Sequence, residues 1–182
     1  MSAPTNYQLS LGSPCIDTGL YLAEVANDLV GMVRPLDGNN DGTAETDIGC
    51  YEFLNSAADS DDDTMDDGWE YAHYLRLLFD DAGENPDNDM FNNAEEYIAD
   101  TDPHNSNDYF RITTITNGIK SAICFNSSSN RIYSLVGCSN ILDISSWQPA
   151  AQSRMGVGGA DSMQSTNTLP IEWYKMKVGI PR

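Results

Sequence analysis

The sequence predicts a mixed, mainly β protein with two acidic loop–helix units near its middle. After residue 108, short segments alternate apolar and polar residues and contain many β-branched and aromatic side chains, as strands do. Residues 1–54 combine short apolar runs with frequent Gly, Pro, Asp and Asn, which indicates short strands and turns. Residues 59–96 contain one acidic pattern twice. We therefore divide the chain into three predicted parts, 1–54, 55–108 and 109–182.

The acidic residues are concentrated in one part of the 182-residue chain, whose formal net charge is −19. Roughly 17 of the 28 Asp and Glu residues lie within 59–108, where Arg76 is the only Arg or Lys. Such a charge argues against binding to nucleic acid or to anionic membranes, because both require basic surface. Trp69, Leu75 and Tyr97 give the segment apolar groups to bury, which disordered acidic linkers lack. We therefore expect an ordered acidic module.

Each acidic repeat places oxygen-bearing side chains at positions 1, 3, 5 and 9 of a twelve-residue window and a glutamate at position 12. This is the ligand spacing of an EF-hand-type calcium loop, in which position 7 supplies its main-chain carbonyl. Carboxylates packed so closely repel one another unless a cation lies between them. The predicted cofactor is therefore Ca2+. The candidate metal ligands are Asp59, Asp61, Asp63, Met65, Asp67 and Glu70 in the first loop, and Asn85, Asp87, Asp89, Phe91, Asn93 and Glu96 in the second.

Position 6 of such loops is normally glycine, but here it is Thr64 in the first loop and Met90 in the second. A larger residue either adopts the left-handed conformation at a cost of roughly 1 kcal/mol or alters the turn. The second loop also has neutral Asn85 and Asn93, so we expect the first loop to bind more tightly. Both affinities are expected in the range of extracellular modules, on the order of 10⁻⁴ M.

A third segment partly repeats the pattern. Asp37, Asn39, Asp41 and Glu45 occupy positions 1, 3, 5 and 9, but position 12 is Ile48 rather than a glutamate. Either a third calcium site or a plain Asp-Gly turn accounts for these residues.

Two helices are predicted behind the acidic loops. Over Gly68–Phe79, Trp69, Ala72, Leu75 and Leu78 follow one another at a spacing of three, which predicts a helix. A shorter helix is predicted over Asn93–Ala99. Leu20–Met32 has spacing compatible with a helix, with a turn or a strand as the alternatives.

The last part of the chain is predicted to form a small β domain. The predicted strands are Tyr109–Thr116, Ser121–Asn126, Arg131–Gly137 and Trp173–Val178, with turns at Asn117-Gly118 and Ser127–Asn130. Isolated aromatic residues on alternating strands usually pack inward, so Tyr133, Trp147 and Tyr174 are expected in the core rather than at a ligand site.

No catalytic arrangement is predicted, and the chain is expected not to be an enzyme. His73 and His104 are the only histidines, and neither has a Ser or Cys partner at a recognisable spacing. The four cysteines lack zinc-site spacing but could pair in an oxidising compartment, and Cys15–Cys50 is the first pair to test. No apolar stretch is long enough for a membrane-spanning helix, so no membrane insertion is expected.

Residues 7–54 carry the motifs "SPCID.G" and "R..DG...G....DIG.YEF". Together they resemble the closing segment of right-handed parallel β-helix proteins, in particular the choice-of-anchor Q surface proteins of bacteria. The resemblance implies that 1–54 is the last coil or cap of a β-helix. Cys50 stands where that family usually has a small residue. A small independent β-rich cap is the alternative.

Residues 59–108 resemble the thrombospondin type 3-like and dockerin-like calcium repeats of secreted bacterial proteins. The segment "RIYSLVGCSN…WYKMKV" resembles the small β-sandwich-like domain that often follows such repeats. These resemblances imply a calcium-binding structural connector of an extracellular or cell-surface protein, in which Ca2+ rigidifies the link between two β domains. Because the first residues lack signal-peptide features, we expect the chain to be a C-terminal piece of a secreted parent.

Two other functions remain open. The chain could be the non-catalytic tail of a β-helix polysaccharide lyase or glycoside hydrolase, in which case the partner is carbohydrate. It could also be a dockerin-like adhesion module, in which case the partner is another surface protein.

Overall fold

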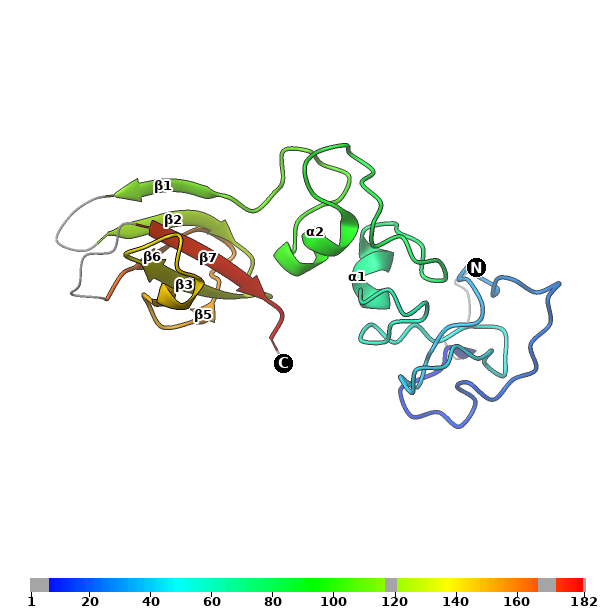
Figure 1. The fold of residues 1–182 in the computed structure, drawn as a ribbon. Helices are drawn as coiled ribbons and strands as arrows, with labels where there is room; N and C mark the ends of the chain where they lie inside the picture. The colour runs from blue at the N-terminus through cyan, green and yellow to red at the C-terminus, as the bar shows by residue number, and fades with distance from the viewer. Residues whose placement is uncertain (1–6, 117–120, 167–172, 182) are drawn as a thin grey trace. The chain divides into compact units, whose positions relative to one another are not determined.

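The structure is a computed structural model that describes residues 7–116, 121–166 and 173–181 (Figure 1). The predicted turn at Asn117-Gly118 lies outside the described residues. The chain divides into two compact units. The first comprises Met1–Pro86 with Asn92–Ala94, and the second comprises Asp87–Phe91 with Glu95–Arg182. The described structure is mainly β, as the sequence predicts.

The first unit begins with turns rather than regular elements. Over residues 7–54 the described chain forms two isolated bridges, between Asn27 and Val33 and between Leu36 and Glu45. Leu20–Met32 is a series of turns, which was one of the three conformations left open by its sequence. A β-helix coil in this region stays a prediction.

Buried carboxylates hold these turns together. Asp47 accepts hydrogen bonds from the N–H of Asp17 at 2.8 Å and from the N–H of Phe53 at 2.6 Å. Glu52 accepts from the N–H of Leu36 at 3.0 Å and pairs with Arg34 at 2.9 Å. Buried N–H groups need acceptors, and in this unit side-chain oxygens serve where a sheet would supply carbonyls.

Two short helices follow, α1 (Asp67–Ala72) and α2 (Asn93–Ala99). The prediction for α2 is confirmed, but the prediction that the first helix runs to Phe79 is wrong. Tyr74 adopts a left-handed conformation with φ of 58°, and the N–H of Leu75 donates to the carbonyl of Glu70 at 2.9 Å. This is the Schellman ending, which turns the chain away from the helix axis. Residues 73–79 therefore form turns.

The described residues of the second unit form two antiparallel sheets. One sheet has the order β1-β2-β6, with β1 at Ile112–Thr116, β2 at Ala122–Ser127 and β6 at Gly159–Gln164. In the other, β3 (Ile132–Cys138) pairs with β4 (Gln148–Pro149), β5 (Arg154–Met155) and β7 (Trp173–Gly179). A 3-10 turn, η2 (Ile144–Ser146), lies between β3 and β4. The predicted strands near 112, 122, 132 and 173 are thus confirmed, whereas β4, β5 and β6 were not predicted.

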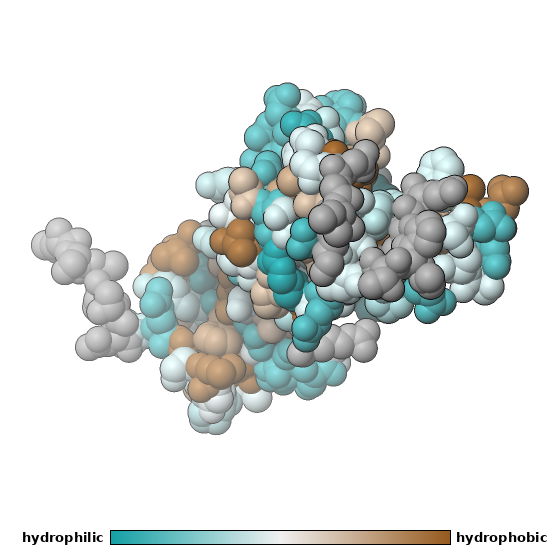
Figure 2. All heavy atoms as spheres, turned by 90° about the vertical axis from the view of Figure 1, so that its left-hand side faces the viewer, coloured by the Kyte–Doolittle hydropathy of each residue, from teal (hydrophilic) through white to brown (hydrophobic). Residues whose placement is uncertain are grey.

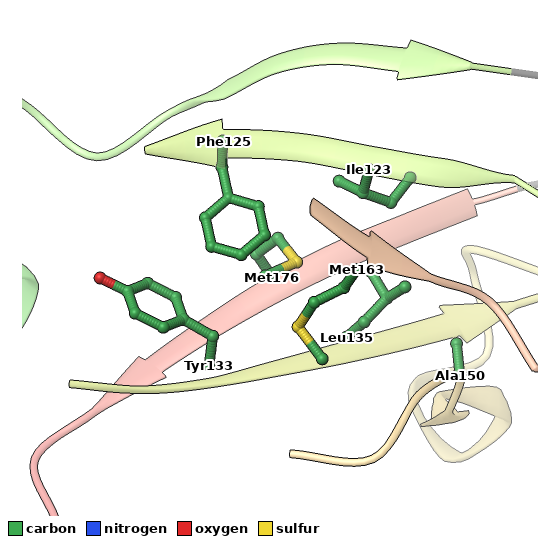
Figure 3. Close-up of a cluster of buried hydrophobic side chains, with 7 residues drawn as sticks. All are labelled: Ile123, Phe125, Tyr133, Leu135, Ala150, Met163 and Met176. Carbon is green, nitrogen blue, oxygen red and sulfur yellow. The ribbon is translucent and has the colours of Figure 1, made fainter. Parts of the chain in front are cut away.

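The core of the second unit lies between the two sheets (Figure 3). One sheet contributes Ile123, Phe125 and Met163, and the other contributes Leu135 and Met176. Tyr133, also on β3, is buried in this cluster as predicted. Tyr174 is partly buried against it, whereas Trp147 is half-buried and not part of the cluster. The two sheets therefore form a small sandwich.

The face shown in Figure 2 carries separate apolar patches among hydrophilic residues rather than one continuous apolar surface. In the first unit, several large apolar side chains are exposed, including Leu20, Tyr21, Leu29 and Val30. Among the described residues, no helix combines the length and the apolar character that crossing a membrane requires.

Candidate metal centre

The first acidic loop is closed by its first residue. Asp59 accepts hydrogen bonds from the N–H of Asp63 at 3.1 Å and from the N–H of Thr64 at 2.8 Å. Thr64 has φ of 80°, so it adopts the left-handed conformation in place of the usual glycine. The folded loop brings carboxylate oxygens of Asp59, Asp61 and Asp63 within 4.8 Å of one another. These three predicted ligands are therefore brought together.

Glu70 is placed beside this loop by the first turn of α1. Its side chain is fully buried, and among the described residues neither carboxylate oxygen has a hydrogen-bond partner. Burial, together with the neighbouring carboxylates of Asp61 and Asp63, raises the pKa of Glu70 to about 9. A buried carboxylate without hydrogen bonds needs either a proton or a cation.

Asp81 belongs to the same centre, although sequence reasoning missed it. A carboxylate oxygen of Asp81 lies within 4.8 Å of oxygens of Asp63 and Glu70, and all three side chains are buried. The N–H of Asp81 donates to Asp63 at 3.3 Å, and Arg76 pairs with Asp81 at 3.1 Å. Asp81 lies outside both twelve-residue windows and reaches the loop because the chain turns back at Tyr74. The residue spacing within a twelve-residue loop therefore gives no indication of Asp81.

The side chain at position 9 of each loop forms hydrogen bonds with another part of the chain. Asp67 is fully buried and accepts from the N–H of Ser60 at 2.8 Å and from its hydroxyl at 2.6 Å. Asn93, also fully buried, donates through Nδ2 to the carbonyl of Asp81 at 2.9 Å. At position 7, Met65 is buried and its N–H donates to Asp63 at 2.9 Å.

The second loop brings together Asp87, Asp89 and Glu96, whose carboxylate oxygens also lie within 4.8 Å of one another. Asp87 accepts from the N–H of Asp89 at 3.1 Å, and Asp89 accepts from the N–H of Phe91 at 2.6 Å. The Phe91 ring stacks on Tyr109 with centroids 5.9 Å apart. Asn85, the first residue of the loop, is half-buried.

Glu96 occupies in α2 the place that Glu70 occupies in α1. It is buried and its Oε1 accepts from the hydroxyl of Thr101 at 3.3 Å, while its Oε2 has no hydrogen-bond partner in the described part of the chain. Burial, followed by the charges of Asp87 and Asp89, raises the pKa of Glu96 to about 7. The pKa of Glu96 is thus raised less than that of Glu70, and one of its oxygens accepts a hydrogen bond.

The segment at Asp37 folds as a turn of the same type. Asp37 accepts from the N–H of Asp41 at 3.0 Å and from the N–H of Gly42 at 2.8 Å. Among the described residues, the acidic groups that could hold a metal do not include Asp37 or Asp41. These hydrogen bonds fit the turn interpretation, and because no described carboxylates gather around Asp37 or Asp41, the third calcium site remains only a sequence pattern.

The other reactive side chains have structural surroundings. His73 contacts the carbonyl of Trp69 through Nδ1 at 2.8 Å, and its ring lies 4.2 Å from that of Trp69. Cys15, Cys50, Cys124 and Cys138 are all free thiols in the structure.

A hollow of about 820 Å³ is lined by Val30–Val33 and by residues 71–72 and 74–79. In the described chain its lining contains no carboxylate, histidine or cysteine.

Taken together, the acidic groups offer only hard oxygen donors, which suit Ca2+ or Mg2+ rather than zinc or copper. No known protein-family model matches the chain, and no curated protein and no solved structure matches it either. The resemblances stated from sequence motifs therefore stay predictions.

Proposed function

We propose that this chain is a calcium-binding structural module in which Ca2+ orders the acidic segment between residues 59 and 96. The ligands of the first loop are the carboxylates of Asp59, Asp61, Asp63 and Glu70 with the carbonyl of Met65. Those of the second are Asp87, Asp89 and Glu96 with the carbonyl of Phe91. The module acts outside the cell, where calcium is abundant enough for weak sites, and it carries no catalysis of its own.

One observation carries this proposal. Glu70 is fully buried among carboxylates, and neither of its oxygens has a hydrogen-bond partner within residues 7–116, 121–166 and 173–181. Leaving such a group ionised without a counter-charge is costly, whereas a cation supplies both charge and coordination. Calcium fits better than magnesium because it accepts several carboxylates at flexible geometry, whereas magnesium keeps much of its water.

The proposal is tested by calorimetric titration of the full chain with calcium chloride. We expect saturable binding in wild type and a loss of bound ions in Glu70→Gln and in Glu96→Gln, since each change removes a ligand carboxylate at nearly constant size. Glu95→Gln is the matched control, because Glu95 is exposed and adjacent to Glu96 but belongs to none of the acidic groups. It should bind as wild type does.

Thermal unfolding gives an independent readout. Calcium that binds only the folded chain raises the melting temperature with concentration, as the measured affinity requires. If wild type shows neither heat nor a shift in melting at millimolar calcium, the acidic segment is not a calcium module. Equal binding by Glu70→Gln and wild type would place the ion elsewhere.

A further inference from the structure

The acidic oxygens of the first unit form two neighbouring groups rather than one. Asp59, Asp61 and Asp63 make the first, and Asp63, Glu70 and Asp81 make the second. In each group the oxygens lie within 4.8 Å of one another, the span of a single calcium shell with ligands at roughly 2.4 Å. Asp63 is common to both groups, and a carboxylate can bridge two cations through its two oxygens.

The second group has an observation of its own that points to a ligand. All three of its side chains are buried, and no described residue forms a hydrogen bond with either oxygen of the fully buried Glu70. Asp81 is held in place by Arg76, whose Nε lies 3.1 Å from its carboxylate. The ion pair between Arg76 and Asp81 positions Asp81 but provides no hydrogen bond to Glu70.

The charges indicate how many cations fit. The two groups together contain five carboxylates, and the cationic side chain that pairs with them in the described structure is Arg76. One divalent cation leaves an excess of negative charge next to buried oxygens. A second divalent cation removes most of this excess, and Arg76 contributes less than a full charge because it also pairs with Glu84.

We propose that the first unit binds two calcium ions, one among Asp59, Asp61 and Asp63 and a second among Asp63, Glu70 and Asp81, with Asp63 bridging them. This inference rests on the proposed calcium function. It assigns Glu70 to a second metal position, separate from the ion of Asp59 and Asp61, and adds Asp81 as a ligand from outside the loop.

The ions are counted by equilibrium dialysis and native mass spectrometry in saturating calcium. Glu96→Gln serves as the background, because it removes the second loop from the count. In this background we expect two bound ions. Adding Asp81→Asn should leave one ion, whereas adding Asp80→Asn should leave two, since Asp80 is the adjacent exposed aspartate.

The outcomes separate the inference from the function it rests on. A single ion in the Glu96→Gln background overturns the second position, whatever Asp81→Asn does, and leaves the calcium module intact. Two ions retained by Asp81→Asn also overturn it. No ion in wild type overturns both. Because the count in the background needs no change at Asp81, it stays decisive even if Asp81→Asn fails to fold.

Discussion

Asp37 and Asp59 hold two loops closed by the same pattern of hydrogen bonds. Each accepts hydrogen bonds from the N–H groups four and five residues further along, which belong to Asp41 and Gly42 in one loop and to Asp63 and Thr64 in the other. The hydroxyl of Ser60 accepts from the N–H of Asp37 at 2.9 Å. What distinguishes the loops is the closing glutamate, which only the later one has.

Replacing Thr64 by glycine should be better tolerated than replacing Met90, although both occupy position 6. Thr64 has φ of 80°, whereas Met90 is exposed and does not have a positive φ. Glycine relieves strain only at Thr64, but it adds entropy to the unfolded chain at both positions. We expect Thr64→Gly to have a free energy of unfolding about 1 kcal/mol above that of Met90→Gly. Urea unfolding in saturating calcium measures the difference, and equal values would mean that Thr64 is unstrained.

Asp67→Asn should destabilise the chain without changing the number of bound ions. Both carboxylate oxygens of Asp67 accept from Ser60, and an amide nitrogen in place of one of them would face a donor. The expected loss is about 1–3 kcal/mol of unfolding free energy. Asp62→Asn is the control, because Asp62 is exposed in the same loop. Loss of an ion in Asp67→Asn at saturating calcium would instead make Asp67 a ligand, as the loop spacing predicts.

Without calcium, stability should fall as the pH rises. Burial and neighbouring carboxylates raise the pKa of Glu70 from 4.5 to about 9 and that of Glu96 to about 7. Between these values and 4.5 the folded chain holds protons that the unfolded chain has released, so raising the pH favours unfolding. The stabilisation is complete below about pH 4.5 for these two groups and is lost by about pH 9.

Chemical unfolding at several pH values, with chelator and with saturating calcium, tests this dependence. Calcium should flatten the pH dependence, because the ion takes the place of the proton. Glu70→Gln should weaken it in chelator too, since glutamine does not titrate, and should leave only the part that Glu96 contributes up to about pH 7. Stability that rises with pH in chelator would show that these glutamates are ionised in the metal-free fold.

Arg131→Ala should unfold the second unit more readily than Arg111→Ala. The Arg131 side chain is buried, donates to the carbonyls of Tyr97 and Ile98 in α2, and lies 3.5 Å from Asp100. Its removal leaves a largely buried carboxylate and carbonyls without this partner, at a cost of about 3–5 kcal/mol. Arg111 is exposed, so its removal should cost little. Equal effects in denaturant unfolding would contradict a structural role for Arg131.

The sequence predicted the parts of the site that depend on local spacing. Asp59, Asp61 and Asp63 alternate along one loop, and the turn that gathers them is encoded by neighbouring residues. Glu70 was found because a glutamate at position 12 follows from the same template. Asp81 was missed because its approach depends on the left-handed Tyr74, and aromatic residues give no sequence signal for that conformation.

The strands, too, were predictable from sequence only where a local residue pattern marks them. β1, β2, β3 and β7 contain β-branched and aromatic residues in alternation, so their positions were predictable. β6 begins at Gly159 and is built mostly from small and polar residues, so it lacks that pattern. Its position is set by pairing with β2, as Ile123 with Met163, which is a tertiary interaction. Pairing between strands so distant in sequence lies beyond what local pattern specifies.

β2 and β3 are separated by a short turn, yet they belong to different sheets. Each finds its main partner much later in the chain, β2 in β6 and β3 in β7. Every such pairing must close a long loop, so the entropy of the unfolded chain opposes the first contacts. The second unit therefore cannot begin from a local hairpin at this turn. Its β3 strand completes its longest pairing only with β7, the last strand of the chain.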